Sequence, residues 1–274
     1  MSKFRLLGIY REKRFSPGTF AQKDAAVLRE VLLRFEKSNL PVETKAIRGE
    51  DLPAIGFEAD LVLTMAQSEE SLQKLESWNL ADNIVNSVPA VRNCYRELMV
   101  AILAEAGVLF PKAVVLSLND LEQSKELPFP CPMWIKRGDV HAMEKGDVVK
   151  ISGKEKMPGV LEHFRCRNIK RITLQEHVEG KVYKFYGVGR GDFFRVYREG
   201  KGGKVSSGWV NDLQKLAIKA AESLGLEVYG GDAIIDSLGK IHIIDMNDWP
   251  SFSPCCEEAA EAIFRYVTSK WQLT

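Results

Sequence analysis

The sequence has almost no net charge, because 38 Lys and Arg residues are balanced by 37 Asp and Glu residues in a chain of 274. A balanced chain creates no long-range field that attracts nucleic acid or an acidic membrane surface. No apolar run approaches membrane-spanning length, and Leu6–Ile9 is too short for the apolar part of a signal peptide. We therefore expect a cytoplasmic protein with no nucleic-acid or membrane partner, in which a local cluster of side chains holds any anionic ligand.

Cysteines at the spacings of a metal site are also missing. The five cysteines are scattered and lack the short paired spacings of a structural zinc site. The neighbours Cys255 and Cys256 are a candidate redox or soft-metal pair, but adjacent cysteines rarely close a comfortable disulfide. Small buried apolar residues are the favoured interpretation.

Two common catalytic patterns are absent as well. No serine, histidine and acid arrangement indicates a hydrolase triad. The glycine-rich stretches Gly187–Gly191 and Gly200–Gly203 do not precede a helix, as a P-loop or a dinucleotide fingerprint requires. Hairpin turns are the favoured interpretation of both stretches.

What the sequence does contain is an alternation of short apolar strands and amphipathic helices in its first third. Strands are predicted at 4–10, 42–47 and 60–65, and helices at 21–37 and 68–78. Such alternation is typical of a parallel sheet flanked by helices. A further helix is predicted from Pro89 until Gly107 ends it, then a strand at 112–116 and a surface loop at 118–132.

The second half is rich in β-strand patterns. Short pieces separated by glycine turns predict an antiparallel sheet, at 133–136, 148–151, 171–175, 182–188 and 193–197. A helix at 211–224 precedes two strands, 229–236 and 240–246, and a closing helix covers 256–270. The turn between these strands has hairpin chemistry, so the two strands should lie side by side.

Oxygen-bearing side chains gather on that predicted hairpin. Asp232 is on its first strand, and Asp245 and Asn247 are on the second. Alternate residues of a strand point the same way, so the three side chains can converge on one magnesium ion, which prefers hard oxygen ligands. The alternative is that these residues merely border turns.

Two further stretches are candidates for binding a nucleotide. Lys136 ends an apolar strand, from which it can direct its charge at a phosphate, or it is an ordinary solvated strand-end lysine. The segment 174–180 runs from strand into loop, where free backbone groups can pair with an adenine edge and Glu179 can accept from ribose hydroxyls.

Taken in chain order, Arg96 and the stretches 132–136, 175–180 and 230–252 resemble the successive nucleotide-binding signatures of the ATP-grasp superfamily. The resemblance implies that Arg96 and Lys136 hold the phosphates of ATP. The hinge would be Gln175, Glu176, His177 and Val178, with Glu179 at the ribose. Asp232, Asp245 and Asn247 would bind two Mg²⁺ ions, with Mn²⁺ as an alternative. Asp245 stands where most ATP-grasp ligases have glutamate.

The resemblance covers nearly the whole chain and implies an α/β (α+β) ATP-grasp fold. An N-terminal parallel α/β domain over 1–90 would precede two α+β subdomains, 91–178 and 179–274, that clamp the nucleotide. The sequence is also similar to bacterial ATP-grasp proteins of unassigned activity that carry the stretches NCYRE, WIKRGDVHA, QEHVEG, KFYG and NDWPSFSP. That similarity names no substrate.

Three activities are compatible with this resemblance. The first is an ADP-forming carboxylate–amine ligase that acts through an acylphosphate, and the second is a small-molecule kinase that phosphorylates a hydroxyl. Amino-acid ligases of the superfamily often carry an arginine at one of two places, beside the position of Lys184 or just ahead of that of Asp232. At the second place this chain has Gly230 and Gly231, which counts against the ligase. Arg96 and the stretch YKFYGVG resemble the ATP-grasp inositol polyphosphate kinases. A nucleotide-binding regulatory protein is the third.

An acceptor pocket is predicted facing Lys136 and the loop 245–252. Lys136, Lys184 and Arg195 are the candidate catalytic cations, because the transferring phosphoryl group spreads negative charge over its oxygens. The rim is predicted to comprise Arg137, His141, Lys184, Arg195 and Trp249. Such a basic rim predicts an anionic small molecule or peptide as acceptor. Trp249 and Phe252 have core packing as the alternative, which we favour for Phe252; the acceptor's identity and the oligomeric state stay open.

Overall fold

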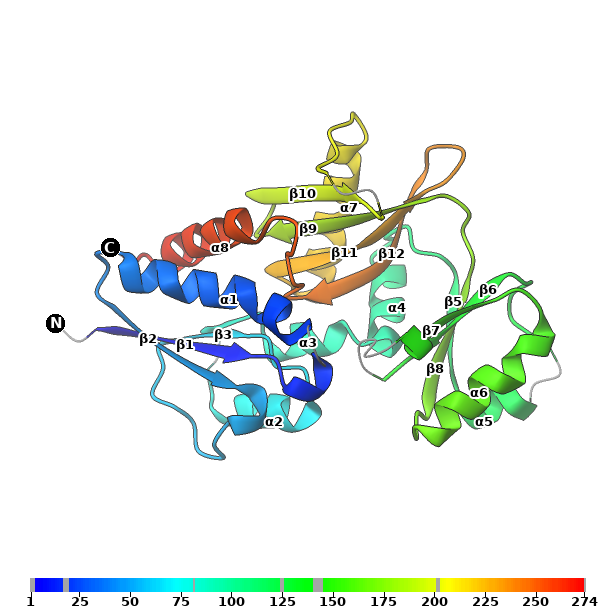
Figure 1. The fold of residues 1–274 in the computed structure, drawn as a ribbon, viewed down its shortest axis with the longest axis horizontal. Coiled ribbons are helices and arrows are strands. Elements are labelled where there is room, and N and C mark those ends of the chain that lie inside the picture. The colour runs from blue at the N-terminus through cyan, green and yellow to red at the C-terminus, as the bar shows by residue number, and fades with distance from the viewer. Residues whose placement is uncertain are drawn as a thin grey trace.

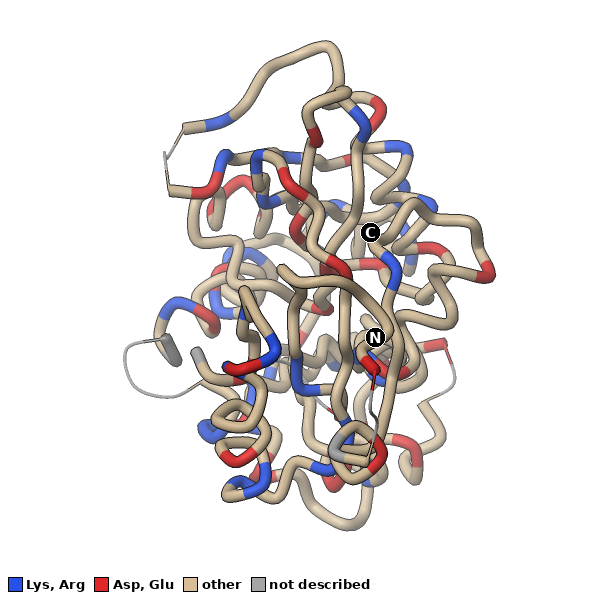
Figure 2. The backbone as a smooth tube through the Cα atoms, turned by 90° about the vertical axis from the view of Figure 1, so that its right-hand side faces the viewer, with Lys and Arg blue, Asp and Glu red and all other residues tan. Residues whose placement is uncertain are grey.

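The computed structural model describes residues 3–16, 20–80, 82–123, 126–139, 145–200 and 203–273. Within these residues the strands form three four-stranded sheets, which are seen in Figure 1. Basic and acidic residues are interspersed along the chain in Figure 2, in keeping with its balanced charge. No helix in the described part combines the length and apolar character needed to cross a bilayer.

The N-terminal sheet is parallel, as the alternating pattern predicts. Its order is β2-β1-β3-β4, with β1 (Phe4–Tyr10), β2 (Val42–Arg48), β3 (Leu61–Thr64) and β4 (Ile84–Val85). Leu6 packs in a core with helix α1 (Phe20–Lys37), whereas Leu7 packs in a second core with α2 (Glu69–Ser77). Successive side chains of a strand point to opposite faces, so β1 contributes to both cores.

The single helix predicted from Pro89 to Gly107 is wrong, because the structure divides it into two. Helix α3 (Val88–Asn93) ends at Cys94, and α4 (Arg96–Glu105) begins after Tyr95. Tyr95 has an extended backbone, and its buried hydroxyl donates to the carbonyl oxygen of Gln67 at 2.7 Å. The break places Arg96 at the first turn of α4.

The middle sheet is antiparallel, in the order β5-β8-β6-β7. Its strands are β5 (Ala113–Ser117), β6 (Met133–Arg137), β7 (Val148–Ile151) and β8 (Arg171–Glu176), with helices α5 (Leu118–Gln123) and α6 (Met157–Cys166). The surface loop predicted at 118–132 is therefore wrong over α5. Leu118 and Leu121 share one helix face and are buried in the core of this sheet.

The C-terminal sheet is also antiparallel, in the order β10-β9-β11-β12. It contains β9 (Lys181–Val188), β10 (Phe193–Arg198), β11 (Val228–Ile235) and β12 (Ile241–Asp248), with α7 (Val210–Leu224) and α8 (Cys256–Lys270). The predicted hairpin of β11 and β12 is confirmed, as is the turn at Gly187–Gly191, which joins β9 to β10. Residues 201 and 202 of the other glycine stretch lie outside the described residues.

The strands that the pattern assigned to one antiparallel sheet are thus divided between two sheets. This division agrees with the two α+β subdomains that the resemblance implies. Short 3₁₀ helices occur at Lys13–Phe15, Gly49–Asp51, Lys145–Asp147 and Lys154–Lys156.

The N-terminal sheet and the C-terminal sheet share one core, whereas the core of the middle sheet is separate. Helix α1 lies against α8 in Figure 1. Asn86, fully buried, donates to the carbonyl oxygen of Val228 and accepts from its backbone NH. Phe252 is buried in this shared core, as predicted.

Cys255 and Cys256 are free thiols at the start of α8. Cys255 is buried, and its burial raises the pKa of its thiol to about 11. A thiol that stays protonated at neutral pH is a poor nucleophile and a poor metal ligand. The structure therefore supports the interpretation of Cys255 as a small buried residue.

Glu12, just after β1, is a buried carboxylate that holds the start of α2. Its oxygens accept hydrogen bonds from the backbone NH groups of Gln67 at 3.1 Å and Ser68 at 3.0 Å. Burial raises the pKa of Glu12, but hydrogen bonds from Ser71, Ser68 and backbone NH groups outweigh it and leave the pKa below its usual value. The folded state therefore favours the charged form.

Replacing Glu12 with glutamine is expected to lower the free energy of unfolding at pH 7 by roughly 1–3 kcal/mol, because a buried charged acceptor is lost. The folded pKa of Glu12 lies below its unfolded value of 4.5, so this stabilisation is present above pH 4.5 and is lost as the pH falls through the folded pKa. Urea unfolding of both proteins at pH 7 and at acid pH measures the difference. Equal stabilities at pH 7, or a difference that persists in acid, would contradict the assignment; exposed Glu50→Gln is the control.

Candidate active site

A cavity of about 290 Å³ is lined by the middle sheet on one side and the C-terminal sheet on the other. Most of the residues predicted to bind a nucleotide or a metal line it: Arg96, Lys136, Gln175, Glu176, His177, Val178, Asp232 and Asp245. These residues are separated by up to about half the chain, and only the packing of the two sheets brings them together.

The two acidic residues of the hairpin face each other across β11 and β12. Asp232 and Asp245 are partners in the strand register, and a bulge follows Asp232. Lys184 Nζ lies 2.9 Å from Asp232 Oδ1, and Arg96 Nη2 lies 3.1 Å from Asp245 Oδ2. Burial raises the pKa of Asp232, and the ion pair with Lys184 opposes this effect.

This donor set fits magnesium bound together with a nucleotide. Mg²⁺ usually takes one or two carboxylates and completes its octahedron with phosphate oxygens and water. Asp232 and Asp245 supply two such carboxylates, and among the described residues no group of three or more His, Cys, Asp and Glu side chains is arranged to hold a metal alone. Asn247 lies two positions after Asp245 and so on the same face of β12, but it does not line the cavity.

Two cations lie beside these carboxylates. Lys136 on β6 is 7% exposed, and burial lowers the pKa of its ammonium to about 8, opposed by the charge of Asp245. Arg96 is 5% exposed and also donates through Nη1 to the carbonyl oxygen of Arg137 at 3.2 Å. Among the described residues, the buried Nε of Arg96 has no hydrogen-bond partner, so this guanidinium has one donor that the protein around it does not use.

Part of the cavity wall is apolar. Its walls include aliphatic side chains from four strands and the hinge: Val148, Val178, Val182, Ile234 and Ile244. Such walls suit the flat faces of a purine base. Gly180 ends the hinge where a Cβ would lie 2.4 Å from the carbonyl oxygen of Ile235, so the close approach to β11 requires glycine.

Glu176 of the hinge and Glu179, which follows it, both contact groups of the protein. Glu176 accepts the backbone NH of Lys112 at 2.8 Å, which ties the end of β8 to the chain before β5. The Glu179 side chain is 90% exposed and contacts His177 Nε2 at 2.8 Å. Glu179 does not line the cavity itself, but Val178 and Gly180 on either side of it do.

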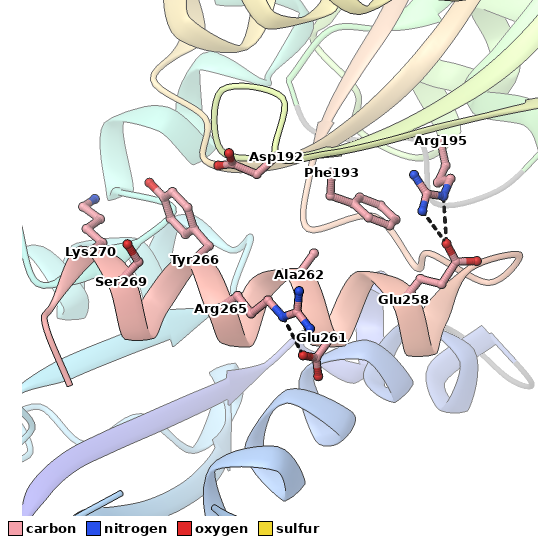
Figure 3. Close-up of a pocket in the computed structure, with 10 residues that line it drawn as sticks. All are labelled: Asp192, Phe193, Arg195, Glu258, Glu261, Ala262, Arg265, Tyr266, Ser269 and Lys270. Atoms are coloured by element: carbon pink, nitrogen blue, oxygen red, sulfur yellow. Dashed lines mark hydrogen bonds and ion pairs between the residues drawn. The ribbon is translucent and has the colours of Figure 1, made fainter. Parts of the chain in front are cut away.

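The structure does not bring Arg195 to this cavity. Arg195 on β10 pairs with Glu258 of α8 at 2.6 Å and lies over the ring of Phe193. These residues line a separate cavity of about 700 Å³ between the β9–β10 turn and α8, shown in Figure 3. Lys184, in contrast, contacts Asp232 and lies 3.9 Å from Glu199, and both acids line the cavity between the two sheets.

The other predicted rim residues also differ in their placement. Trp249 is fully buried and donates to the carbonyl oxygen of Val85 at 3.0 Å, so its prediction as a rim residue is wrong and core packing is the correct alternative. Arg137 pairs with Asp139 at 2.6 Å. His141 lies outside the described residues.

Sequence reasoning missed several residues of the cavity. Ile234 follows Asp232 by two positions, so strand alternation alone was a sufficient signal for it. Trp134 is likewise two positions before Lys136 on β6. Glu199 had no such signal, because it reaches the cavity only through the pairing of β10 with β9.

No protein-family profile matches the sequence, and no curated protein matches it. Solved structures do match over the full chain. The D-alanine-D-alanine ligase from Coxiella burnetii has 12% identity and a TM-score of 0.68, covering 99% of this chain and 97% of that chain. The VanG D-Ala:D-Ser ligase from Enterococcus faecalis has 12% identity and a TM-score of 0.69, covering 97% and 98%.

A third match is the D-alanine–D-alanine ligase from Bacillus anthracis complexed with ATP. It has 12% identity and a TM-score of 0.66, covering 99% of this chain and 100% of that chain. Identities this low show a shared fold and do not establish a substrate. The chain has the ATP-grasp fold, with an N-terminal parallel-sheet domain followed by two antiparallel-sheet subdomains.

Proposed function

We propose that this protein is a Mg-ATP-dependent, ADP-forming enzyme that joins a carboxylate to an amine through an acylphosphate. The observation that carries the proposal is the pairing of two carboxylates with cations at one cavity, Asp232 with Lys184 and Asp245 with Arg96, beside the buried Lys136. The similarity in fold to ligases, one of them crystallised with ATP, supports it.

The proposed reaction begins when an acceptor carboxylate oxygen attacks the γ-phosphorus of ATP and the bond to the β-phosphate oxygen breaks, which releases ADP. An amine then attacks the acyl carbon and inorganic phosphate leaves. Lys136 and Arg96 place positive charge next to the transferring oxygens, and the apolar walls limit the access of water. Magnesium, held by Asp232 and Asp245 with the phosphates, would supply further positive charge there.

The acceptor in this proposal is an anionic small molecule or peptide. Lys184 supports it, because its side chain is 44% exposed next to the cavity and is therefore accessible to a bound anion. Arg195 has no role in the proposed reaction, because the pair with Glu258 holds its side chain at the other cavity.

A kinase that phosphorylates a hydroxyl is the second candidate, and one observation favours it. A Cβ at Gly231 would lie 2.2 Å from the carbonyl oxygen of Asp245 and 2.6 Å from a ring atom of Phe185. No side chain fits at this position, so the arginine that amino-acid ligases often carry just ahead of Asp232 has no place here. The ligase step would have to use another cation for its acyl intermediate.

The test is incubation of the protein with Mg-ATP and pooled cell metabolites, followed by measurement of ADP and of mass changes in the pool. ADP and inorganic phosphate, with two metabolites joined by loss of water, are the result expected for the ligase. A metabolite heavier by one phosphoryl group would establish the kinase instead. The absence of ADP would favour a nucleotide-binding regulatory protein and overturn both enzyme assignments.

A further inference from the structure

His177 connects two strands of the middle sheet to the hinge segment. Trp134 Nε1 on β6 lies 3.1 Å from His177 Nδ1, and Lys150 Nζ on β7 lies 2.8 Å from His177 Nε2. Glu179 Oε2 is also 2.8 Å from Nε2. The imidazole is nearly enclosed, with 12% of its side chain exposed, whereas the Glu179 side chain is 90% exposed. The ring is therefore held in place, and it contacts a carboxylate that is otherwise open to water.

The partners of the ring determine its tautomer. An indole NH is only a donor, so Nδ1 of His177 has to accept from Trp134 and cannot carry a proton. Nε2 lies 2.8 Å from both the Lys150 ammonium, which only donates, and Glu179 Oε2, which only accepts. A neutral ring that accepts from Trp134 carries its proton on Nε2, donates it to Glu179 and cannot accept from Lys150, whose charge then acts on Glu179. This hydrogen bond, together with the charge of Lys150, holds the pKa of the Glu179 carboxyl below its usual value. Glu179 is thus an anionic acceptor whose direction His177 sets.

The position of Glu179 in the chain would place it near the ribose of a nucleotide bound in the cavity. His177, Val178 and Gly180 line the cavity that also contains the proposed phosphate and metal ligands. Glu179, between Val178 and Gly180, is at the cavity's edge. A nucleotide with its phosphates at Lys136 and its base at the hinge would have its ribose between them, beside the cavity-lining residues that flank Glu179.

We propose that His177 is a positioning residue that orients Glu179 toward the ribose hydroxyls and makes the site prefer ribonucleotides to 2′-deoxyribonucleotides. This inference rests on the proposed function, since it assumes that the cavity binds ATP. An exposed glutamate without the imidazole samples several rotamers and loses its fixed direction. His177 acts only through Glu179 and needs no contact with the ligand.

The experiment measures the dissociation constants of Mg-ATP and Mg-2′-deoxy-ATP for the chain of 274 residues by calorimetry. Wild type is expected to bind ATP about tenfold more tightly, the value of one hydrogen bond to a charged acceptor near the surface. His177→Ala and Glu179→Gln should each reduce that ratio to about one to three. Trp134→Phe, which removes the indole NH together with part of the ring that lines the cavity, should reduce it in the same direction. His163→Ala, at an exposed position of α6, is the control and should leave the ratio unchanged.

A double variant separates positioning from a general loss of structure. If His177 acts through Glu179, adding His177→Ala to Glu179→Gln should change the ratio no further. A further loss in the double variant, or a wild-type ratio in His177→Ala, would overturn the inference while ATP binding still supports the proposed function. Wild-type protein that binds neither nucleotide would overturn both.

Discussion

Replacing Asp245 with asparagine is expected to reduce ADP release from Mg-ATP by at least about 100-fold, because a metal at a transferring phosphoryl group contributes several kcal/mol. Asp245 and Asp232 are the two carboxylates at the cavity that face each other across the hairpin. Asparagine keeps the shape of the side chain and an oxygen that accepts from Arg96. The charge that attracts the cation is lost, while the buried guanidinium keeps a hydrogen-bond partner.

A coupled ADP assay over a range of magnesium concentrations measures this effect. The loss should be smaller at high magnesium if the variant only weakens cation binding. Asp212→Asn is a matched control, because Asp212 on α7 is 70% exposed and pairs only weakly with Lys215. Wild-type turnover in Asp245→Asn, with an unchanged unfolding temperature, would remove the metal assignment.

Replacing Lys136 with methionine is expected to raise the KM for ATP and lower kcat together, with a loss in kcat/KM of about 100-fold or more. The ammonium of Lys136 is buried beside Asp245. Water therefore cannot enter and compensate for the loss of its positive charge. Methionine occupies a similar volume without charge. Since burying an ammonium is costly, the variant should unfold at the same or a higher urea concentration than wild type.

The combination of lower activity with undiminished stability is the informative result for Lys136. Steady-state kinetics with ATP varied and urea unfolding of the same preparation measure both quantities. Lys215→Met, at an exposed position of α7, controls for the loss of a lysine and should match wild type in both. An unchanged rate in Lys136→Met would show that this lysine is only a buried structural residue of β6.

The elements that sequence reasoning predicted well are those with strong local signals. The hairpin of β11 and β12 has its turn chemistry in four consecutive residues, and α8 has the bounds Cys256–Lys270 that its apolar pattern indicated. Strand alternation on this hairpin also placed Asp232 and Asp245 on one face before any packing was known. The roles of these residues and the domain boundaries near 90 and 178 stay predictions.

The errors have tertiary causes. The pattern from Pro89 to Gly107 is continuous, but Tyr95 has an extended backbone between the two helices, and its hydroxyl bonds to Gln67, which is distant in sequence. Helix α5 is short and charged, and only burial of Leu118 and Leu121 against the middle sheet explains it. Strand patterns do not record which strands share a sheet, so two sheets were predicted as one.

The sequence by itself determined the α/β order of elements, the hairpin with its acids and the lysine at the end of β6, because periodicity and turn chemistry act over a few residues. The tertiary structure alone decided which of these residues share a cavity. It joined Arg96 and Lys136 to Asp245, placed Trp134 on His177, and held Arg195 at Glu258 on α8. Such contacts depend on the packing of sheets that are distant along the chain, and no local pattern encodes that packing.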